Sequence, residues 1–148
     1  MTSTSSEDLD LYSSISIKDE IETVIYSLEE NDSAMVQKVN EGFIWKFQYG
    51  SVEVFVQLTG QNNDDTLTVW SVVLALPAND EPQLMRQLLE LNWHSTFEAG
   101  FAIFDNQIVV STQRTLEGLD VSEISRSITL VATIADEYDD QLQETYGK

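Results

Sequence analysis

Two segments of this chain alternate with a period of two and are separated by only two residues, Gly50-Ser51. The segment from Phe43 to Tyr49 places four aromatic residues on one side, and the segment from Val52 to Leu58 places four aliphatic residues on one side. A Gly-X pair between such segments is typical of a tight antiparallel hairpin, in which the two apolar sides face the same way. The hairpin predicts a sheet with one wholly apolar face, and this feature constrains the fold most strongly.

Two further regions have the character of strands. Thr66 to Leu76 carries apolar residues on both sides, which is typical of a strand that is covered on both faces. Met35 to Val39 also has strand character, although the order predicted below counts only the other five strands.

A second hairpin is predicted from residues 97–104 and 107–113, because both Asp105 and Asn106 are residue types that tolerate a positive φ. Phe101 and Ile103 are expected on its core side. The other side holds small residues that let another backbone or helix come close, namely Gly100, Ala102 and Ser111.

Three amphipathic stretches predict helices over residues 17–30, 81–93 and 121–146. Each follows a capping pattern, formed by Ser16 and Asp19, Asp80 and Gln83, and Asp120 and Glu123. The predicted order is helix, three strands, helix, two strands, helix. We therefore expect an α+β fold with a twisted, mainly antiparallel five-stranded sheet.

The length of 148 residues suits one domain around a single core. Residues 1–14 are acidic, rich in Ser and Thr and poor in apolar residues, so they are predicted to be a disordered tail. Deleting this tail should leave the thermal stability nearly unchanged. Residues 15–148 are predicted to form the single domain.

The formal charge of -19 excludes some partners, because 26 acidic residues stand against seven basic ones. Such a chain repels nucleic-acid phosphates and anionic lipid surfaces, so neither a nucleic acid nor a membrane is expected as a partner. The chain has no cysteine, no basic and apolar leader, and no apolar run of the ~20 residues that span a bilayer. A cytoplasmic location is therefore expected.

The residues that carry most enzyme chemistry are scarce in this chain. His94 is the one histidine, and no phosphate-binding or nucleophile motif occurs. The acidic loop from Asn62 to Asp65 lacks the ligand spacing of a calcium loop. We predict no catalytic residues, no metal and no cofactor, and hence no enzyme.

A few residues suggest a second apolar surface on the side of the sheet opposite the first. Ile44 and Phe55 lie among polar neighbours of the first hairpin, and Trp70 lies in the strand that is apolar on both sides. Together with Gly100, Ala102 and Ser111 they form the candidate partner or dimer surface. A partner chain, a bound peptide, or a folded-back loop or tail could cover it.

The second half of the chain resembles the bacterial YbjN family of sensory transduction regulators, and the element order is similar to that of class I type III secretion chaperones. The resemblance rests on residues 88–92, 100–105, 107–110, 116–120 and 135–139, and covers roughly residues 84–142. It implies a noncatalytic, dimeric domain that binds a partner protein or peptide, as a chaperone or as a regulator. The alternative is a small-molecule-sensing regulatory domain with its ligand between sheet and helices.

Overall fold

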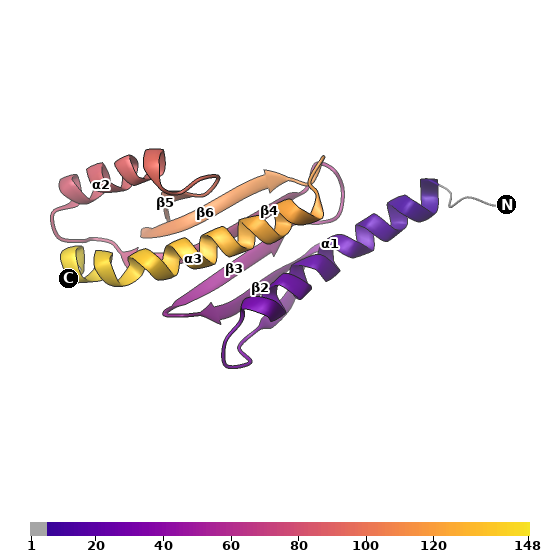
Figure 1. Ribbon diagram of the computed structural model, residues 1–148, viewed down its shortest axis with the longest axis horizontal. Helices are drawn as coiled ribbons and strands as arrows, with labels where there is room; N and C mark the ends of the chain where they lie inside the picture. Colours follow the sequence, from indigo (N-terminus) through magenta and orange to yellow (C-terminus); the bar gives the residue numbers. More distant parts are fainter. Residues whose placement is uncertain (1–5) are drawn as a thin grey trace.

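The computed structural model describes the backbone of residues 6–148 and the side chains from residue 17 onward, and it shows helices packed on an antiparallel sheet (Figure 1). In chain order the elements are α1 (Ser6–Leu28), β1 (Met35–Val39), β2 (Gly42–Tyr49), β3 (Val52–Leu58), β4 (Thr66–Ala75), α2 (Glu81–His94), β5 (Gly100–Phe104), β6 (Gln107–Thr115) and α3 (Val121–Tyr146).

The six strands lie in the order β1-β2-β3-β4-β6-β5, and each neighbouring pair is antiparallel. The predicted α+β class and antiparallel sheet are confirmed, whereas the predicted number of five strands is wrong. The strand expected at Met35 to Val39 is confirmed as β1, so the total was one strand short. β1 turns back onto β2 through a short connection where Asn40 takes a φ of 54°. Asparagine adopts this left-handed conformation more easily than most residues.

The first predicted hairpin is confirmed, including its register. Trp45 lies opposite Val56 and Phe47 lies opposite Val54. Gly50 takes the positive φ, 55°, that suits a tight turn. A side chain at this position would also collide with Asp136 of α3. The glycine therefore closes the hairpin and lets α3 approach its end.

The second hairpin is confirmed at its turn, where Asp105 and Asn106 have φ values of 52° and 59°. Phe101 lies opposite Val110, as predicted. The predicted strand start at residue 97 is wrong, because β5 begins at Gly100. The expected place of Ile103 in the core is also wrong. This side chain faces the predicted way but is 58% exposed, since β5 is an edge strand.

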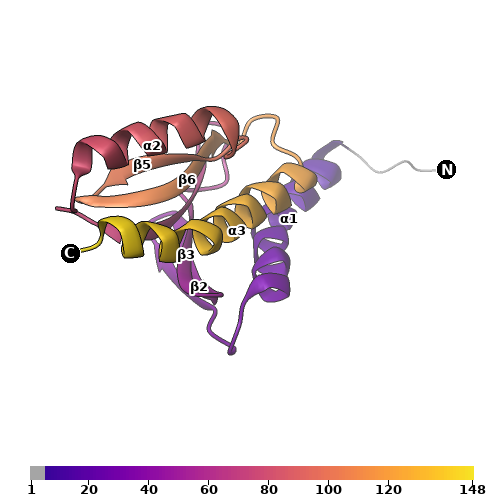
Figure 2. The same ribbon diagram turned by 60° about the vertical axis from the view of Figure 1, so that its left-hand side comes forward.

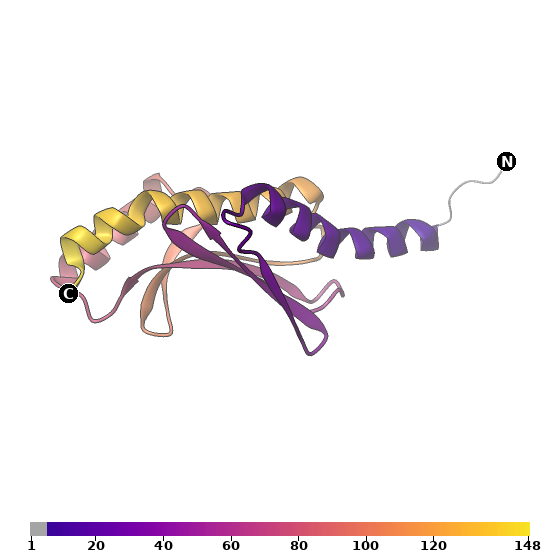
Figure 3. The same ribbon diagram turned by 90° about the horizontal axis from the view of Figure 1, so that it is seen from below.

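All three helices lie on the same side of the sheet, with α3 crossing its middle strands and α1 beside α3 (Figures 2 and 3). The inward stripe of α3 repeats at helical spacing, as the sequence predicts. Its apolar members include Ile124, Ile128, Val131, Ala135 and Leu142, all of them buried. They pack mainly on β4 and, together with the apolar face of the first hairpin, form the main core. The other side of the sheet is free of helices (Figure 3).

The helix starts agree with the sequence only in part. Asp120 caps α3 as predicted, because its carboxylate accepts a 2.9 Å hydrogen bond from the backbone N–H of Glu123. Asp80 does not cap α2 with its side chain, since its φ of 48° is left-handed. There the Glu81 carboxylate accepts a hydrogen bond from the backbone N–H of Ala78 instead.

The first helix begins at Ser6 and not near residue 17, because no glycine or proline interrupts the chain between residues 6 and 28. Its amino-terminal half extends past the edge of the sheet (Figure 3). Residues 1–5 of the predicted tail lie outside the described residues. The disorder of residues 1–14 stays a prediction.

Candidate functional site

The six residues predicted as a partner or dimer surface all lie on the side of the sheet that carries no helix. We call this side the open sheet face (Figure 3). The register shows the grouping directly, because Phe55 lies opposite Trp70 and Trp70 lies opposite Ser111. Gly100 is the next residue across, and alternation places Ala102 and Ile44 on the same face. The tertiary structure therefore brings these residues together from five strands.

A row of three aromatic rings crosses the open sheet face. Phe55 stacks on Trp70 with ring centroids 5.3 Å apart, and Trp70 meets the edge of Phe104 at 6.0 Å. The sequence indicated no neighbouring apolar side chain for Phe55, and the structure shows that Trp70 is this neighbour. Phe104 nevertheless remains 56% exposed, so the row is open to another molecule. We call these three residues the aromatic row.

Two hollows lie on the open sheet face beside the aromatic row. One has a volume of about 320 Å³ and lies between Trp70 and Phe104, with Val109 in its lining. The other has a volume of about 410 Å³ and lies beside Phe55, with Met35 and Ile44 in its lining. Both hollows offer apolar surface. The first also has the Gln57 amide and the Thr68 hydroxyl in its lining, and the second has the Gln37 amide and Lys46.

The open sheet face is nearly free of charge, which sets it apart from the chain as a whole. Among its strand residues in the described part of the chain, only Lys46 and Glu53 are charged. Their side chains lie 3.8 Å apart as an ion pair. The net charge of -19 is therefore carried elsewhere. A partner that docks here meets apolar rings and neutral polar groups.

Sequence reasoning missed two residues of this face, Phe104 and Val109. Val109 is only 2% exposed although it lies outside the main core cluster. Both could have been found from the second hairpin, because residues 102 and 104 share a side in a strand and residue 109 pairs with residue 102.

A second apolar region was also missed, on the outer side of α2 and along β5. Its large side chains are strongly exposed: Leu89 by 69%, Trp93 by 86%, Phe97 by 74% and Ile103 by 58%. We call these four residues the α2–β5 patch. The sequence could have predicted this region from the spacing of Leu89 and Trp93. These two residues are four apart and share a side of the helix that differs from the side of Leu84 and Leu88.

The edge of β5 is closed at Phe101 by a side chain of α2. The Asn92 side chain accepts a 2.8 Å hydrogen bond from the backbone N–H of Phe101 and donates one of 3.3 Å to its carbonyl. The amide thus satisfies the outward backbone groups of Phe101, as a neighbouring strand would.

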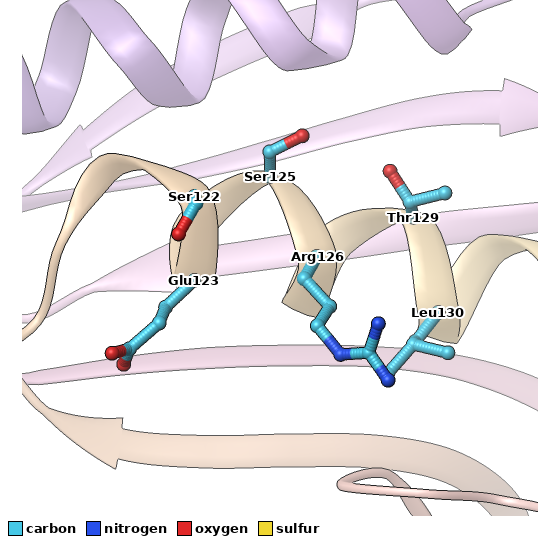
Figure 4. Close-up of a pocket in the computed structure, with 6 residues that line it drawn as sticks. All are labelled: Ser122, Glu123, Ser125, Arg126, Thr129 and Leu130. Carbon is cyan, nitrogen blue, oxygen red and sulfur yellow. The ribbon is translucent and has the colours of Figure 1, made fainter.

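A further hollow lies along the amino-terminal half of α3, with a volume of about 510 Å³ (Figure 4). It is lined by three hydroxyl residues together with Glu123, Arg126 and Leu130. The Arg126 guanidinium donates a 2.9 Å hydrogen bond to Glu98 and thereby holds the pKa of this carboxyl below its usual value. Because the Arg126 guanidinium is already paired with Glu98, it is not free to bind a charged ligand in this hollow.

The residues considered for chemistry are scattered. His94 is exposed at the end of α2. Asp136 accepts a hydrogen bond from the backbone N–H of Ser51, and Asp139 accepts one from the Ser51 hydroxyl, so both join α3 to the turn of the first hairpin. Within residues 17–148, no three His, Cys, Asp or Glu residues gather in a way that suits a metal ion. In the same part of the chain, no helix has the length and apolar character to cross a membrane.

Comparison with known proteins identifies a family. The model of the YbjN family, described as "Putative bacterial sensory transduction regulator", matches residues 18–144. The match includes the amino-terminal half, where the sequence showed likeness only in element order. No curated protein matches the chain.

Two solved structures are similar in fold. The crystal structure of the ExsC-ExsE complex matches 77% of this chain and 79% of that chain, with 15% identity and a TM-score of 0.48. The structure of the HopA1-SchA chaperone-effector complex matches 87% of this chain and 97% of that chain, with 9% identity and a TM-score of 0.49.

Proposed function

The chain belongs to the YbjN family, and we propose that it is a noncatalytic protein-binding domain that acts as a dimer on a partner protein, as a chaperone or as a regulator. We place the partner segment on the open sheet face. The observation that carries this proposal is the aromatic row of Phe55, Trp70 and Phe104, in an almost uncharged surrounding.

Exposed aromatic rings of this kind suit the binding of a peptide segment. Large rings supply much of the contact energy in protein interfaces, and they lose little conformational freedom on binding because they have few rotatable bonds. Hollows on both sides of Phe55 and Trp70 provide room for apolar side chains of the partner. Gln57 and Thr68 provide amide and hydroxyl groups for its backbone.

The charge of the open sheet face narrows the chemistry of the partner. Lys46 and Glu53 neutralise each other, so a strongly charged segment would gain little there and would lose its hydration. We therefore propose an uncharged segment that presents two or more apolar side chains. The net charge of -19 continues to argue against nucleic acids and anionic membranes as partners.

The alternative of a small molecule between sheet and helices is less well supported. The side chains that lie there are packed against one another, and Phe47, Val54 and Ile128 are almost completely buried. A ligand of ordinary size would have to displace them. A metabolite that raises the melting temperature of the wild-type chain would favour this alternative.

The proposal is tested by affinity capture from the native host with three forms of the chain. The wild type should enrich one or a few proteins. A Phe55→Ser, Trp70→Ser variant should lose them, because it removes the stacked pair. A Tyr26→Ser variant removes an exposed ring on α1, away from the open sheet face, and should retain them as the control.

Binding should then be measured with purified partner segments by fluorescence anisotropy, and we expect at least a tenfold loss of affinity in the double variant. Equal capture by the wild type and the double variant, with both folded by circular dichroism, would show that the open sheet face is not the binding surface.

A further inference from the structure

We propose that Met35 is a site of reversible oxidation, and that its sulfoxide weakens the binding of a partner at the open sheet face. The inference rests on the proposed function and adds a means of regulating the same surface. Three observations support it: the exposure of the Met35 thioether, its place in the hollow beside Phe55, and the lysine that lies across from it.

The first observation is the exposure of the sulfur. Met35 is 62% exposed on β1, an edge strand of the sheet. Oxidation of a side-chain sulfur follows its access to the oxidant. Met85, the other methionine within residues 17–148, is partly buried on α2. The chain has no cysteine, so no thiol of its own competes for the oxidant. Between these two methionines, an oxidant therefore reaches Met35 more readily.

The oxidant in this proposal is a hydroperoxide such as hydrogen peroxide. A lone pair of the Met35 sulfur attacks one peroxide oxygen, the O–O bond breaks, and the products are a sulfoxide and water. The sulfur is oxidised by two electrons, and the peroxide is reduced by the same two. Methionine sulfoxide reductases return the thioether at the expense of thiols, with release of water, so the modification is reversible.

The second observation is that Met35 lines the hollow of about 410 Å³ beside Phe55, together with Ile44. An unbranched thioether adapts to neighbours of different shape, which suits the apolar side chain of a partner. A sulfoxide is polar, so an apolar side chain that enters the hollow would displace its water without replacing the lost hydrogen bonds. Oxidation therefore makes this hollow less favourable for the proposed partner segment.

The third observation is the residue across from Met35. Lys46 lies directly opposite Met35 in the register of β1 and β2, and it lines the same hollow. Its ammonium group donates hydrogen bonds, and a sulfoxide oxygen accepts them. The ion pair of Lys46 with Glu53 is long, at 3.8 Å, and both side chains are about half exposed, so the pair is weak. A bond from Lys46 to the sulfoxide would leave Glu53 as an unpaired negative charge on the open sheet face.

Peptide mapping by mass spectrometry tests the site itself. The full chain is treated with dilute hydrogen peroxide, and the sulfoxide at each methionine is followed with time. In the folded chain Met35 should be oxidised several-fold faster than Met85, because it is more exposed, and in urea the two rates should become equal. Equal rates in the folded chain would overturn the proposal.

Fluorescence anisotropy with a purified partner segment tests the effect on binding. The oxidised wild type should bind about fivefold more weakly than the untreated chain, and sulfoxide reductase should restore the affinity. Met35→Leu should keep its affinity after the same treatment. It retains Met1 and Met85, so it is the matched control for oxidation elsewhere. Met35→Gln, which places a polar group of similar length in the hollow, should bind as weakly as the oxidised wild type without any peroxide.

The Phe55→Ser, Trp70→Ser variant separates this inference from the proposed function. If this variant loses the partner while the oxidised wild type keeps its full affinity, the proposed binding surface stands and this inference fails. If both keep the partner, both proposals fail. A loss of affinity on oxidation that Met35→Leu shares would place the sensitive residue elsewhere and would also overturn the inference.

Discussion

The two faces of the sheet are built from the same strands and differ in what lies above them. On the face toward the helices, Phe47 and Val54 face each other across β2 and β3 and are almost completely buried. On the open sheet face, Phe55 and Trp70 also face each other across two strands, yet they remain partly exposed. Cross-strand pairing is therefore the same on both faces, whereas burial depends on whether a helix covers the strands. The first pair stabilises the fold, and the second is available for binding.

The largest expected effect is on the covered face. Phe47→Ala should lower the free energy of unfolding by about 3–5 kcal/mol, because it leaves a cavity in a closely packed core. Urea denaturation followed by circular dichroism measures the loss. A loss below about 1 kcal/mol would show that Phe47 does not belong to a closely packed core and that the two faces do not differ in packing.

A polar contact also holds the cover in place. Asp139 is buried on α3 and accepts a hydrogen bond from the Ser51 hydroxyl at the turn of the first hairpin, with its two carboxylate oxygens 2.8 and 3.0 Å from the hydroxyl oxygen. Asp139→Ala should lower the free energy of unfolding by about 1.5–3 kcal/mol, since a hydrogen bond to a charged group is lost. The control is Asp140→Ala, an exposed neighbour whose replacement should change stability by less than about 0.5 kcal/mol. Equal effects would show that Asp139 does not anchor α3.

On the open sheet face the same type of truncation should matter less for folding. Phe55→Ala should lower the free energy of unfolding by about 1 kcal/mol. The loss is small because the ring is partly exposed and its main contact is the stacking on Trp70. The matched comparison with Phe47→Ala sharpens the contrast between the faces. Two equal losses would show that the open sheet face is part of the core, and the proposed binding site would then fail.

The smallest effect is expected far from both faces, at the exposed pair of Glu98 and Arg126. The pKa of Glu98 is lowered by its hydrogen bond to Arg126, so the folded state favours the ionised carboxyl. The contribution of this pair is present above the usual pKa of 4.5 and is lost as the pH falls through the lowered value. Melting temperatures of the wild type and Arg126→Gln should differ slightly at pH 7 and converge in acid. A difference that grows in acid would contradict this assignment.

One edge of the sheet also depends on a contact between two different elements. At β5 the edge is closed at Phe101 by the amide of Asn92. No spacing in the sequence indicates this contact, because it joins the last turn of a helix to the following strand through a particular loop path. Sequence alone placed Asn92 in a helix and Phe101 in a strand, and both are confirmed.

By itself the sequence determined the local features of this protein. Alternation with a period of two and the turn residues define both hairpins and their register, and the helical stripe and the Asp120 cap define α3. Each of these features depends on residues that are close along the chain or directly across a tight turn. Over so short a stretch the backbone has few allowed conformations.

Only the tertiary structure decided which apolar residues are covered. Strand alternation sorted Ile44, Phe55 and Ala102 onto sides of their own hairpins, but the pairing of β4 with β6 placed them on one face. It also left Trp93 and Ile103 exposed, although both residue types are common in cores. The physical reason is that coverage depends on where helices distant in the sequence pack, and a strand or a helix carries the same local pattern whether or not another element lies above it.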